Sequence, residues 1–141
     1  FTFSPLSGFA KVSYSVSTLF GTVNSTGSYY PDLTMNYDTG VWGLALNGHV
    51  GYQYVAGNQP GASVAPTNYV NQSIANVSNS TLSSYTDWKL GVTKDFGGGL
   101  SGAIAYVGTN AATYKGAYSY VSPSGNNLGK STGLISLTKT F

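Results

Sequence analysis

The sequence predicts an all-β protein that folds as an antiparallel up-and-down transmembrane β-barrel, with six strands in this chain. Three observations lead to this prediction. Six segments alternate apolar and polar residues with a period of two. Short and long connections alternate between these segments, as they do in outer-membrane barrels. The closing segment, Gly133–Phe141, is apolar on one side, rich in hydroxyls on the other, and ends on an aromatic residue.

The composition is unusual for a soluble domain and argues against helical membrane spans. Charged residues make up 7% of the chain, against about 25% in soluble domains. Hydrophobic residues at 41% and aromatic residues at 14% favour an ordered β structure over disorder. The longest apolar run, Ala103–Val107, is far shorter than the roughly 18 residues of a spanning helix. We treat the 141 residues, 1–141, as a single barrel domain.

The first three predicted strands each have an apolar and a polar face, because successive side chains of a strand point to opposite sides. In Phe9–Thr18, the apolar face consists of Ala10, Val12, Tyr14 and Val16. In Ser28–Asp38, it consists of Tyr29, Leu33, Met35 and Tyr37. In Gly43–Ala56, it consists of Leu44, Leu46, Val50, Tyr52 and Tyr54.

The last three predicted strands continue this pattern. In Ser84–Phe96, the apolar face consists of Trp88, Leu90, Val92 and Phe96. The faces of Leu100–Asn110 are less distinct, because Leu100, Ile104 and Tyr106 are opposed by Ala103, Ala105 and Val107. In Leu128–Phe141, three hydroxyl residues oppose Ile135, Leu137 and Phe141. Those three residues resemble the C-terminal signal that the outer-membrane assembly machinery reads. Lys139 departs from that signal, which usually has an apolar or aromatic residue there.

The connections between the strands differ in length in a regular way. Residues 4–8, 39–42 and 97–99 form short connections, and the last two are turns that contain glycine. The longer connections are residues 19–27, 57–83 and 111–127. Loops of more than about 12 residues are uncommon in compact soluble domains. Outer-membrane barrels have short periplasmic turns and long outer loops, so we expect the short turns on the periplasmic side.

The chain resembles the TorF family of proposed porins, a bacterial outer-membrane family of unknown function. The matching stretches are Lys11–Ser15, Tyr29–Asp38, Leu46–Gln53, Tyr85–Asp95 and Ile135–Phe141. The resemblance implies a barrel of about a dozen strands, of which this chain supplies the C-terminal half. We therefore expect a domain that is incomplete at its N-terminus. Six strands alone do not enclose a barrel of ordinary size, so a missing half or a second copy in a homo-oligomer must close the sheet.

If the chain is a porin, its polar strand faces line a lumen through which small solutes pass passively, and its apolar faces contact outer-membrane lipid. The long loops then constrict the mouth of that lumen. The predicted lumen-lining residues are Lys11, Asp32, Asn36, Asn47, His49, Gln53, Asp87, Lys89, Thr93 and Lys130. Asp87 and Lys89 lie two residues apart on one face, and we interpret them as partners of charged or polar groups on neighbouring strands. The mixed signs argue against strong ion selectivity.

Other chemistries find little support in the sequence. His49 is the only candidate general base, and no serine is singled out as its nucleophile, so we expect no enzyme. Four dispersed aspartates and one histidine have no recognised metal-ligand spacing, and cysteine is absent. There is no glycine-rich phosphate loop, so no cofactor is expected. The net charge of +2 is scattered and arginine is absent, which argues against nucleic acid as a partner.

A second reading belongs to another class of protein. A chain rich in tyrosine, serine and asparagine, with few charges, also suits an extracellular structural or adhesive β protein that forms fibres by pairing its strands. The porin should require detergent or lipid to stay in solution, whereas the fibre subunit should not.

Overall fold

The structure, a computed structural model, describes residues 1–61, 73–111 and 113–141. These residues form one seven-stranded sheet, in the order β1-β2-β3-β4-β5-β6-β9, and a separate two-stranded sheet of β7 and β8. The strands of the large sheet are β1 (Thr2–Phe3), β2 (Leu6–Tyr14), β3 (Tyr29–Asp38), β4 (Leu44–Gln53), β5 (Tyr85–Gly97), β6 (Leu100–Thr109) and β9 (Thr132–Lys139). Each strand pairs antiparallel with the next one along the sheet. The predictions of an all-β fold and of consecutive antiparallel strands are confirmed.

The six predicted strands correspond to β2, β3, β4, β5, β6 and β9, and the first and the last differ most from their predicted bounds. The sequence predicts a first strand over Phe9–Thr18, whereas β2 spans Leu6–Tyr14. The sequence predicts a strand over Leu128–Phe141, whereas β9 spans Thr132–Lys139. The backbone of Leu128 and Gly129 is already used elsewhere, because Leu128 donates to the Tyr120 carbonyl and the Gly129 carbonyl accepts from the Thr109 hydroxyl. The residues before β9, Lys130 among them, therefore belong to the preceding loop.

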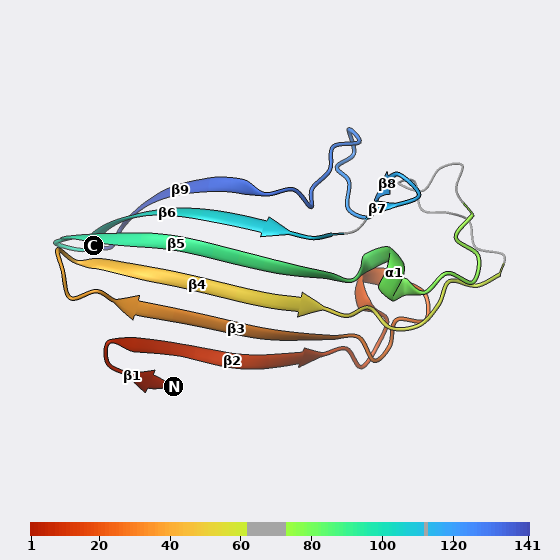
Figure 1. Cartoon of the computed structure of the whole chain (residues 1–141), viewed down its shortest axis with the longest axis horizontal. Coiled ribbons are helices and arrows are strands. Elements are labelled where there is room, and N and C mark those ends of the chain that lie inside the picture. The colour runs from red at the N-terminus through yellow and green to blue at the C-terminus, as the bar shows by residue number, and fades with distance from the viewer. Residues whose placement is uncertain (62–72, 112) are drawn as a thin grey trace.

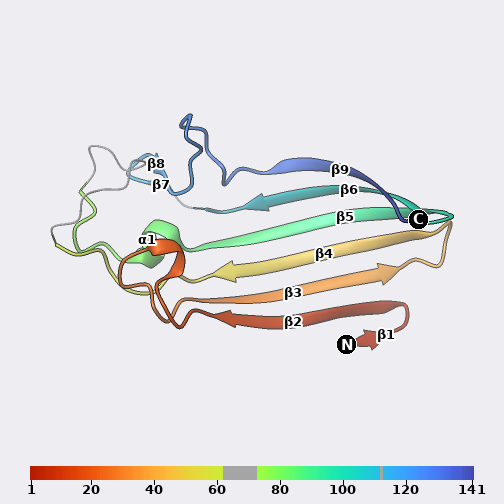
Figure 2. The ribbon, with the colours of Figure 1, turned by 180° about the vertical axis from the view of Figure 1, so that it is seen from behind.

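Short turns gather at one end of the sheet and long loops at the other (Figures 1 and 2). Both labelled chain ends lie towards the short-turn end. The turn between β5 and β6 contains three successive glycines with φ of +80°, +58° and +78°, a conformation that disfavours other residues. The predicted alternation of connection lengths is confirmed for the described residues. Residues 62–72 and 112, which belong to two of the predicted loops, lie outside the described residues.

Short elements that the sequence did not predict occur in the long loops. They are the 3₁₀ turn η1 (Leu19–Gly21), the helix α1 (Asn79–Ser83) and the hairpin strands β7 (Thr113–Tyr114) and β8 (Ala117–Tyr118). Helix α1 begins after Ser78, whose hydroxyl accepts a hydrogen bond from the backbone N–H of Thr81. Within the described part of the chain, no helix is both long enough and apolar enough to cross a membrane.

The register of the sheet gives it two chemically different faces, because residues opposite each other on paired strands point to the same side. We call one side the apolar face. Its members include Val12, Leu33, Leu46, Val50, Leu90, Ile104, Tyr106, Ile135 and Leu137. These side chains are exposed, and Ile135, Val12 and Leu90 reach 88%, 70% and 66%. The predicted faces are confirmed, and the ambiguous faces of β6 are resolved with Ile104 and Tyr106 on the apolar side.

The other side, the polar face, carries most of the charged strand residues. It contains all four aspartates of the chain, Asp32, Asp38, Asp87 and Asp95, together with Lys11 and Lys89. Some large apolar residues also lie on this side, among them Phe9, Val107 and Leu134. Lys94 and Lys139 are on the apolar face, close to the short turns. The ammonium of Lys139 donates to the carbonyl of Gly98 in a short turn, which draws the charge away from the apolar residues.

The buried core lies among the long loops and not on the sheet. Its apolar members are Val55, Ile74 and Leu82, each at most 2% exposed. The amide of Asn79, which is fully buried, joins three segments of these loops. Its Nδ2 donates to the carbonyls of Val23 and Ala56 at 2.8 and 2.7 Å, and its Oδ1 accepts from Gln59 at 2.6 Å. We call these packed loop residues, Val55, Ile74, Leu82 and Asn79 with its hydrogen-bond partners, the loop cap. It forms one compact end of a sheet whose two faces carry no second layer of described residues.

The two edges of the sheet are open within the described residues. At one edge, β1 pairs only with Leu6 and Ser7 of β2, so the outer side of the rest of β2 has no strand beside it. At the other edge, β9 pairs only with β6. The strands β2 and β9 lie towards opposite edges of the sheet and do not pair with each other (Figure 1). The described residues therefore form an open antiparallel β-meander with two unpaired edges, and not a closed barrel.

Candidate functional site

The polar face brings together nearly all the residues that the sequence predicted to line a lumen. Nine of the ten lie in strands on this face, namely Lys11, Asp32, Asn36, Asn47, His49, Gln53, Asp87, Lys89 and Thr93. The tenth, Lys130, lies in the loop before β9, so its predicted place on a strand is wrong. The structure groups eight of the nine into a charged cluster, an amide row next to it, and a contact with a long loop, and the ninth is Lys89.

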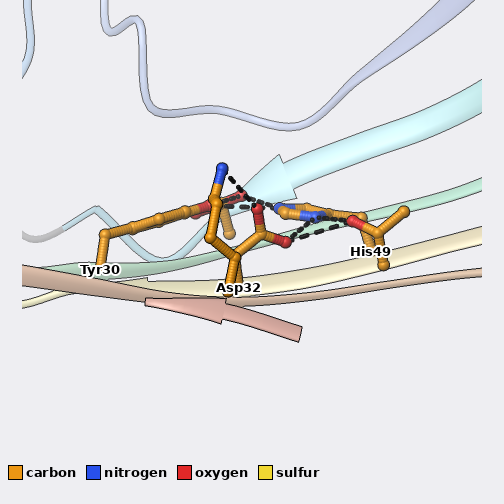
Figure 3. Close-up of polar contacts among 6 residues, drawn as sticks. Tyr30, Asp32 and His49 are labelled. Atoms are coloured by element: carbon orange, nitrogen blue, oxygen red, sulfur yellow. Dashed lines mark hydrogen bonds and ion pairs between the residues drawn. The ribbon is translucent and has the colours of Figure 1, made fainter. Parts of the chain in front are cut away.

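The charged cluster is centred on His49, whose imidazole lies between two carboxylates (Figure 3). Its Nδ1 is 3.1 Å from Asp32 Oδ1, and its Nε2 is 2.8 Å from Asp87 Oδ1. A ring protonated on both nitrogens donates a hydrogen bond to each carboxylate, whereas a neutral ring donates from only one nitrogen. The cluster therefore links β3, β4 and β5 through one side chain.

Three further side chains complete the cluster. Lys11 of β2 contacts Asp32 Oδ2 at 3.4 Å, directly opposite it in the register. The hydroxyl of Thr34 lies 3.2 Å from Asp32 Oδ1 and 3.0 Å from His49 Nδ1. The Tyr30 hydroxyl donates to Asp87, 3.0 and 2.9 Å from its two oxygens, and lies 3.2 Å from His49 Nε2. The cluster is thus a network across four strands, and no buried side-chain nitrogen or oxygen of the described residues lacks a partner.

A glycine makes the long reach of Tyr30 possible. Gly51 of β4 lies between Asp32 and Asp87 in the register, and it is buried. A Cβ at Gly51 would overlap both the hydroxyl and the ring of Tyr30. The phenol therefore crosses β4 over a residue without a side chain to reach Asp87 on β5. The alternation in the sequence places Thr34 on the same face as Asp32, but Thr34 was not among the predicted lumen-lining residues. Tyr30 was missed, although it also shares the parity of Asp32 on β3.

The amide row lies next to the cluster, towards the short turns. Thr93 Oγ1 donates to Asn47 Oδ1 at 2.7 Å, and Asn47 Nδ2 donates to Asn36 Oδ1 at 2.8 Å. The row crosses β5, β4 and β3 in one direction. Lys89 lies between this row and the cluster, opposite His49 in the register.

The predicted pairing with neighbouring strands is found for Asp87 but not for Lys89. Asp87 does pair across strands, through His49 and Tyr30. Lys89, in contrast, forms no ion pair with any residue in the described part of the chain. The reason is local, since the carboxylates of Asp32 and Asp87 already have other partners.

A long loop touches the polar face at its far end. Gln53 Nε2 donates to the hydroxyl of Tyr120, which in turn donates to the carbonyl of Ser83. The ring of Tyr120 also packs edge-on against Tyr85, with 5.3 Å between ring centroids. The loop between β6 and β9 is therefore bent over the polar side of the sheet, next to the loop cap.

The chemistry that these contacts allow is recognition and charge pairing. Thr34, His49 and Asp87 have the residue types of a hydroxyl–base–acid series, but Asp32 shares Nδ1 of His49 with Thr34 and also accepts from the Thr34 hydroxyl. That hydroxyl is thus tied to a carboxylate. Among residues 1–61, 73–111 and 113–141, no group of three or more His, Cys, Asp or Glu side chains is arranged to hold a metal ion.

The residues of the predicted assembly signal extend from the middle of β9 to just beyond its short-turn end. Ile135 and Leu137 point from the apolar face and are 88% and 73% exposed. Phe141 follows the end of the strand and is fully exposed, with the Lys139 ammonium 5.7 Å from its ring centroid. None of the three side chains therefore takes part in a packed core of this chain.

Comparison with known proteins gives one match. Residues 1–141 match the model of a family described as bacterial protein of unknown function, Gcw_chp. No curated protein and no solved structure matches the chain. The match covers the whole length, including every strand of the sheet and the residues of the charged cluster. The chain belongs to the Gcw_chp family of bacterial proteins of unknown function.

Proposed function

We propose that this protein is an outer-membrane β-barrel porin in which the polar face lines a water-filled lumen and the apolar face contacts lipid. The observation that carries the proposal is the sheet itself, a single antiparallel layer with one exposed apolar face and one charged face. The resemblance of the strands to TorF-family porins supports the same assignment. Small solutes pass passively through the lumen.

The apolar face is difficult to reconcile with water. Soluble monomers rarely expose apolar patches larger than a few hundred Å². Here, large apolar side chains are exposed on every full-length strand, among them Val12, Leu33, Leu46, Leu90, and Ile104. The strand lengths also suit a bilayer, since tilted membrane strands need about 9–11 residues. The strands β2, β3, β4 and β6 have 9, 10, 10 and 10 residues.

The open edges support a barrel that further strands complete. Unpaired backbone groups at the edges of β2 and β9 cannot remain in hydrocarbon, where no water satisfies them. About eight strands are needed before a barrel interior is wide enough for side chains to fill it. Only six strands of this sheet are of full length, because β1 has two residues. The additional strands come from a second copy or from further sequence of a longer protein.

The polar face has features that suit a lumen. Four of its ionisable residues, Lys11, Asp32, His49 and Asp87, are joined in a network, which suits a polar interior without a packed core. Tyr120 and the loop cap lie at the end of this face, where they narrow one mouth. In this proposal the cluster around His49 stabilises the lumen wall and is not catalytic. Outer-membrane lipid and the outer-membrane assembly machinery are the partners.

Conductance across a planar lipid bilayer tests the proposal. The purified, folded protein should give stepwise currents in potassium chloride, and an unfolded sample should not. Ala103→Trp, on the polar face of β6, should lower the unit conductance because the indole fills the lumen. Ile104→Trp, the neighbouring residue on the apolar face, should leave it unchanged. Absence of stepwise current, or an equal effect of the two substitutions, would contradict the proposal. A protein that stays in solution without detergent and forms fibres would support the alternative of an extracellular fibre subunit.

A further inference from the structure

A concavity of about 370 Å³ opens on the polar face, beside the charged cluster. Its lining includes Asn36, Asn47, His49, Lys89 and Thr93, from the strands β3, β4 and β5. Each of these three strands has a paired strand on both sides. The concavity therefore lies in the middle of the sheet, and strands added at the open edges of β2 and β9 would not fill its floor.

Lys89 brings to this concavity an ammonium group that has no ion-pair partner among the described residues. Its nearest acidic neighbour on the strand is Asp87, two residues away on the same face. The Asp87 carboxylate already accepts from Tyr30 and contacts His49 Nε2, and Asp32 contacts Lys11 and His49. Within the described part of the chain, no carboxylate lies within ion-pair distance of Lys89.

The amide row adds hydrogen-bond donors to the same concavity. The amide oxygens of Asn36 and Asn47 each accept from the next residue along the row. The row ends at Asn36, whose Nδ2 donates to no other residue that the structure describes. The concavity therefore presents an ammonium group and a free amide N–H₂, while its acceptor oxygens are engaged. Such a set of groups matches an oxyanion, which has only acceptors, and does not match a cation.

The more distant acids do not change this match. Asp38 and Asp95 lie on the same face at the short-turn end, and each uses Oδ1 to accept a backbone N–H of its own turn, from Gly40 and Gly97. Within the cluster and the concavity, the two carboxylates are balanced by the two lysines, even if His49 is neutral.

We propose that this concavity, the Lys89 subsite, binds the oxyanion group of a small anionic solute, a carboxylate or a phosphate. Lys89 is the charge partner and Asn36 the amide donor. The inference rests on the proposed function, because it names the class of solute that the lumen holds on its way through. Neutral solutes of similar size bind less well, because they leave the ammonium without a counter-charge.

Equilibrium binding to the folded protein in detergent tests the subsite. Isothermal titration calorimetry with inorganic phosphate and, separately, with acetate should show saturable binding of at least one, and glycerol should show none. Phosphate alone would assign a phosphate-bearing solute, acetate alone a carboxylate, and both a subsite for the shared oxyanion. Lys89→Gln should weaken binding about tenfold or more, since a charge-assisted hydrogen bond is lost. Asn36→Leu should weaken it by a smaller factor.

Two further variants separate a local site from general charge. Lys94→Gln removes the same charge from the same strand but on the apolar face, and it should leave binding unchanged. Lys89→Arg keeps the charge and should retain binding. Absence of saturable binding of either anion, equal loss in Lys94→Gln and Lys89→Gln, or unchanged binding in Lys89→Gln would overturn the inference. The calorimetry measures binding and not current, so it is independent of the conductance test. Conductance without anion binding contradicts only the subsite. Anion binding without conductance contradicts only the pore.

Discussion

Leu90→Lys is the substitution that tests the apolar face most severely. Leu90 lies midway along β5, which spans Tyr85–Gly97, and its side chain is 66% exposed on the apolar face. A lysine at the mid-plane of a membrane barrel costs about 2–4 kcal/mol, and about 0–1 kcal/mol near the interface. We therefore expect Leu90→Lys to lower the free energy of unfolding in lipid by about 2–4 kcal/mol. This corresponds to roughly a 30- to 700-fold change in the folding equilibrium.

The matched control is Thr93→Lys on the polar face of the same strand. It loses the hydrogen bond from Thr93 to Asn47, which is worth about 0.5–1.5 kcal/mol, but it places the ammonium in water. Lys94 is a natural case of a lysine on the apolar face near the short turns. Lys94→Leu should therefore change the free energy of unfolding by at most about 1 kcal/mol.

The assay is urea-induced unfolding in lipid vesicles, followed by Trp88 and Trp42 fluorescence and by the mobility of unheated samples on gels. The expected order of stability is wild type, then Thr93→Lys, then Leu90→Lys. Equal destabilisation by Leu90→Lys and Thr93→Lys would refute the assignment of the two faces. Greater damage from Thr93→Lys would indicate that the polar face, and not the apolar face, is the one that packs against an apolar phase.

Three other predictions follow from individual contacts. Gly51→Ala should lower the urea midpoint because its Cβ displaces Tyr30 from Asp87, whereas Gly48→Ala, with no atom within 4 Å of its Cβ, should not. Asn79→Ala should destabilise the protein by about 1–3 kcal/mol and should speed proteolysis of the long loops, since the hydrogen bonds from its buried amide to two carbonyls are lost; unchanged cleavage would disprove the role of the loop cap. Deletion of Phe141, which is fully exposed, should reduce membrane insertion in cells but leave the urea midpoint of refolded protein unchanged, and normal insertion would contradict a signal role.

Much of the sheet could be predicted because the two faces of a strand appear in the sequence as an alternation of apolar and polar residues with a period of two. The alternation in residues 44–53 and 85–97 is clean, and both segments are strands with the expected faces. The three glycines at 97–99 also predict a turn, and all three adopt φ values that favour glycine. The strand β6 was ambiguous, because Ala103 and Ala105 are small apolar residues on the polar side. Only the pairing of Ala103 with Thr93 and Ser136 shows which side these two alanines share.

The charged cluster could be predicted only in part, because its geometry depends on contacts between strands. The sequence placed Asp32, His49 and Asp87 on one face, but not His49 between the two carboxylates. Tyr30 was missed because its reach to Asp87 depends on the absence of a side chain at Gly51, which is distant in the sequence. The strand start at Leu128 was wrong for a similar reason, since the Tyr120 carbonyl binds that backbone N–H.

The most direct test of the two-faced barrel is the labelling of single cysteines in lipid vesicles, which is clean because the sequence contains no cysteine. Asn47→Cys and Thr93→Cys lie on the polar face, and their neighbours Leu46→Cys and Val92→Cys lie on the apolar face. We predict that a charged, water-soluble thiol reagent modifies the first pair, and that an apolar reagent dissolved in the bilayer modifies the second. Modification of all four positions by the water-soluble reagent, or of the apolar-face pair alone, would contradict a lumen on the polar face and lipid on the other.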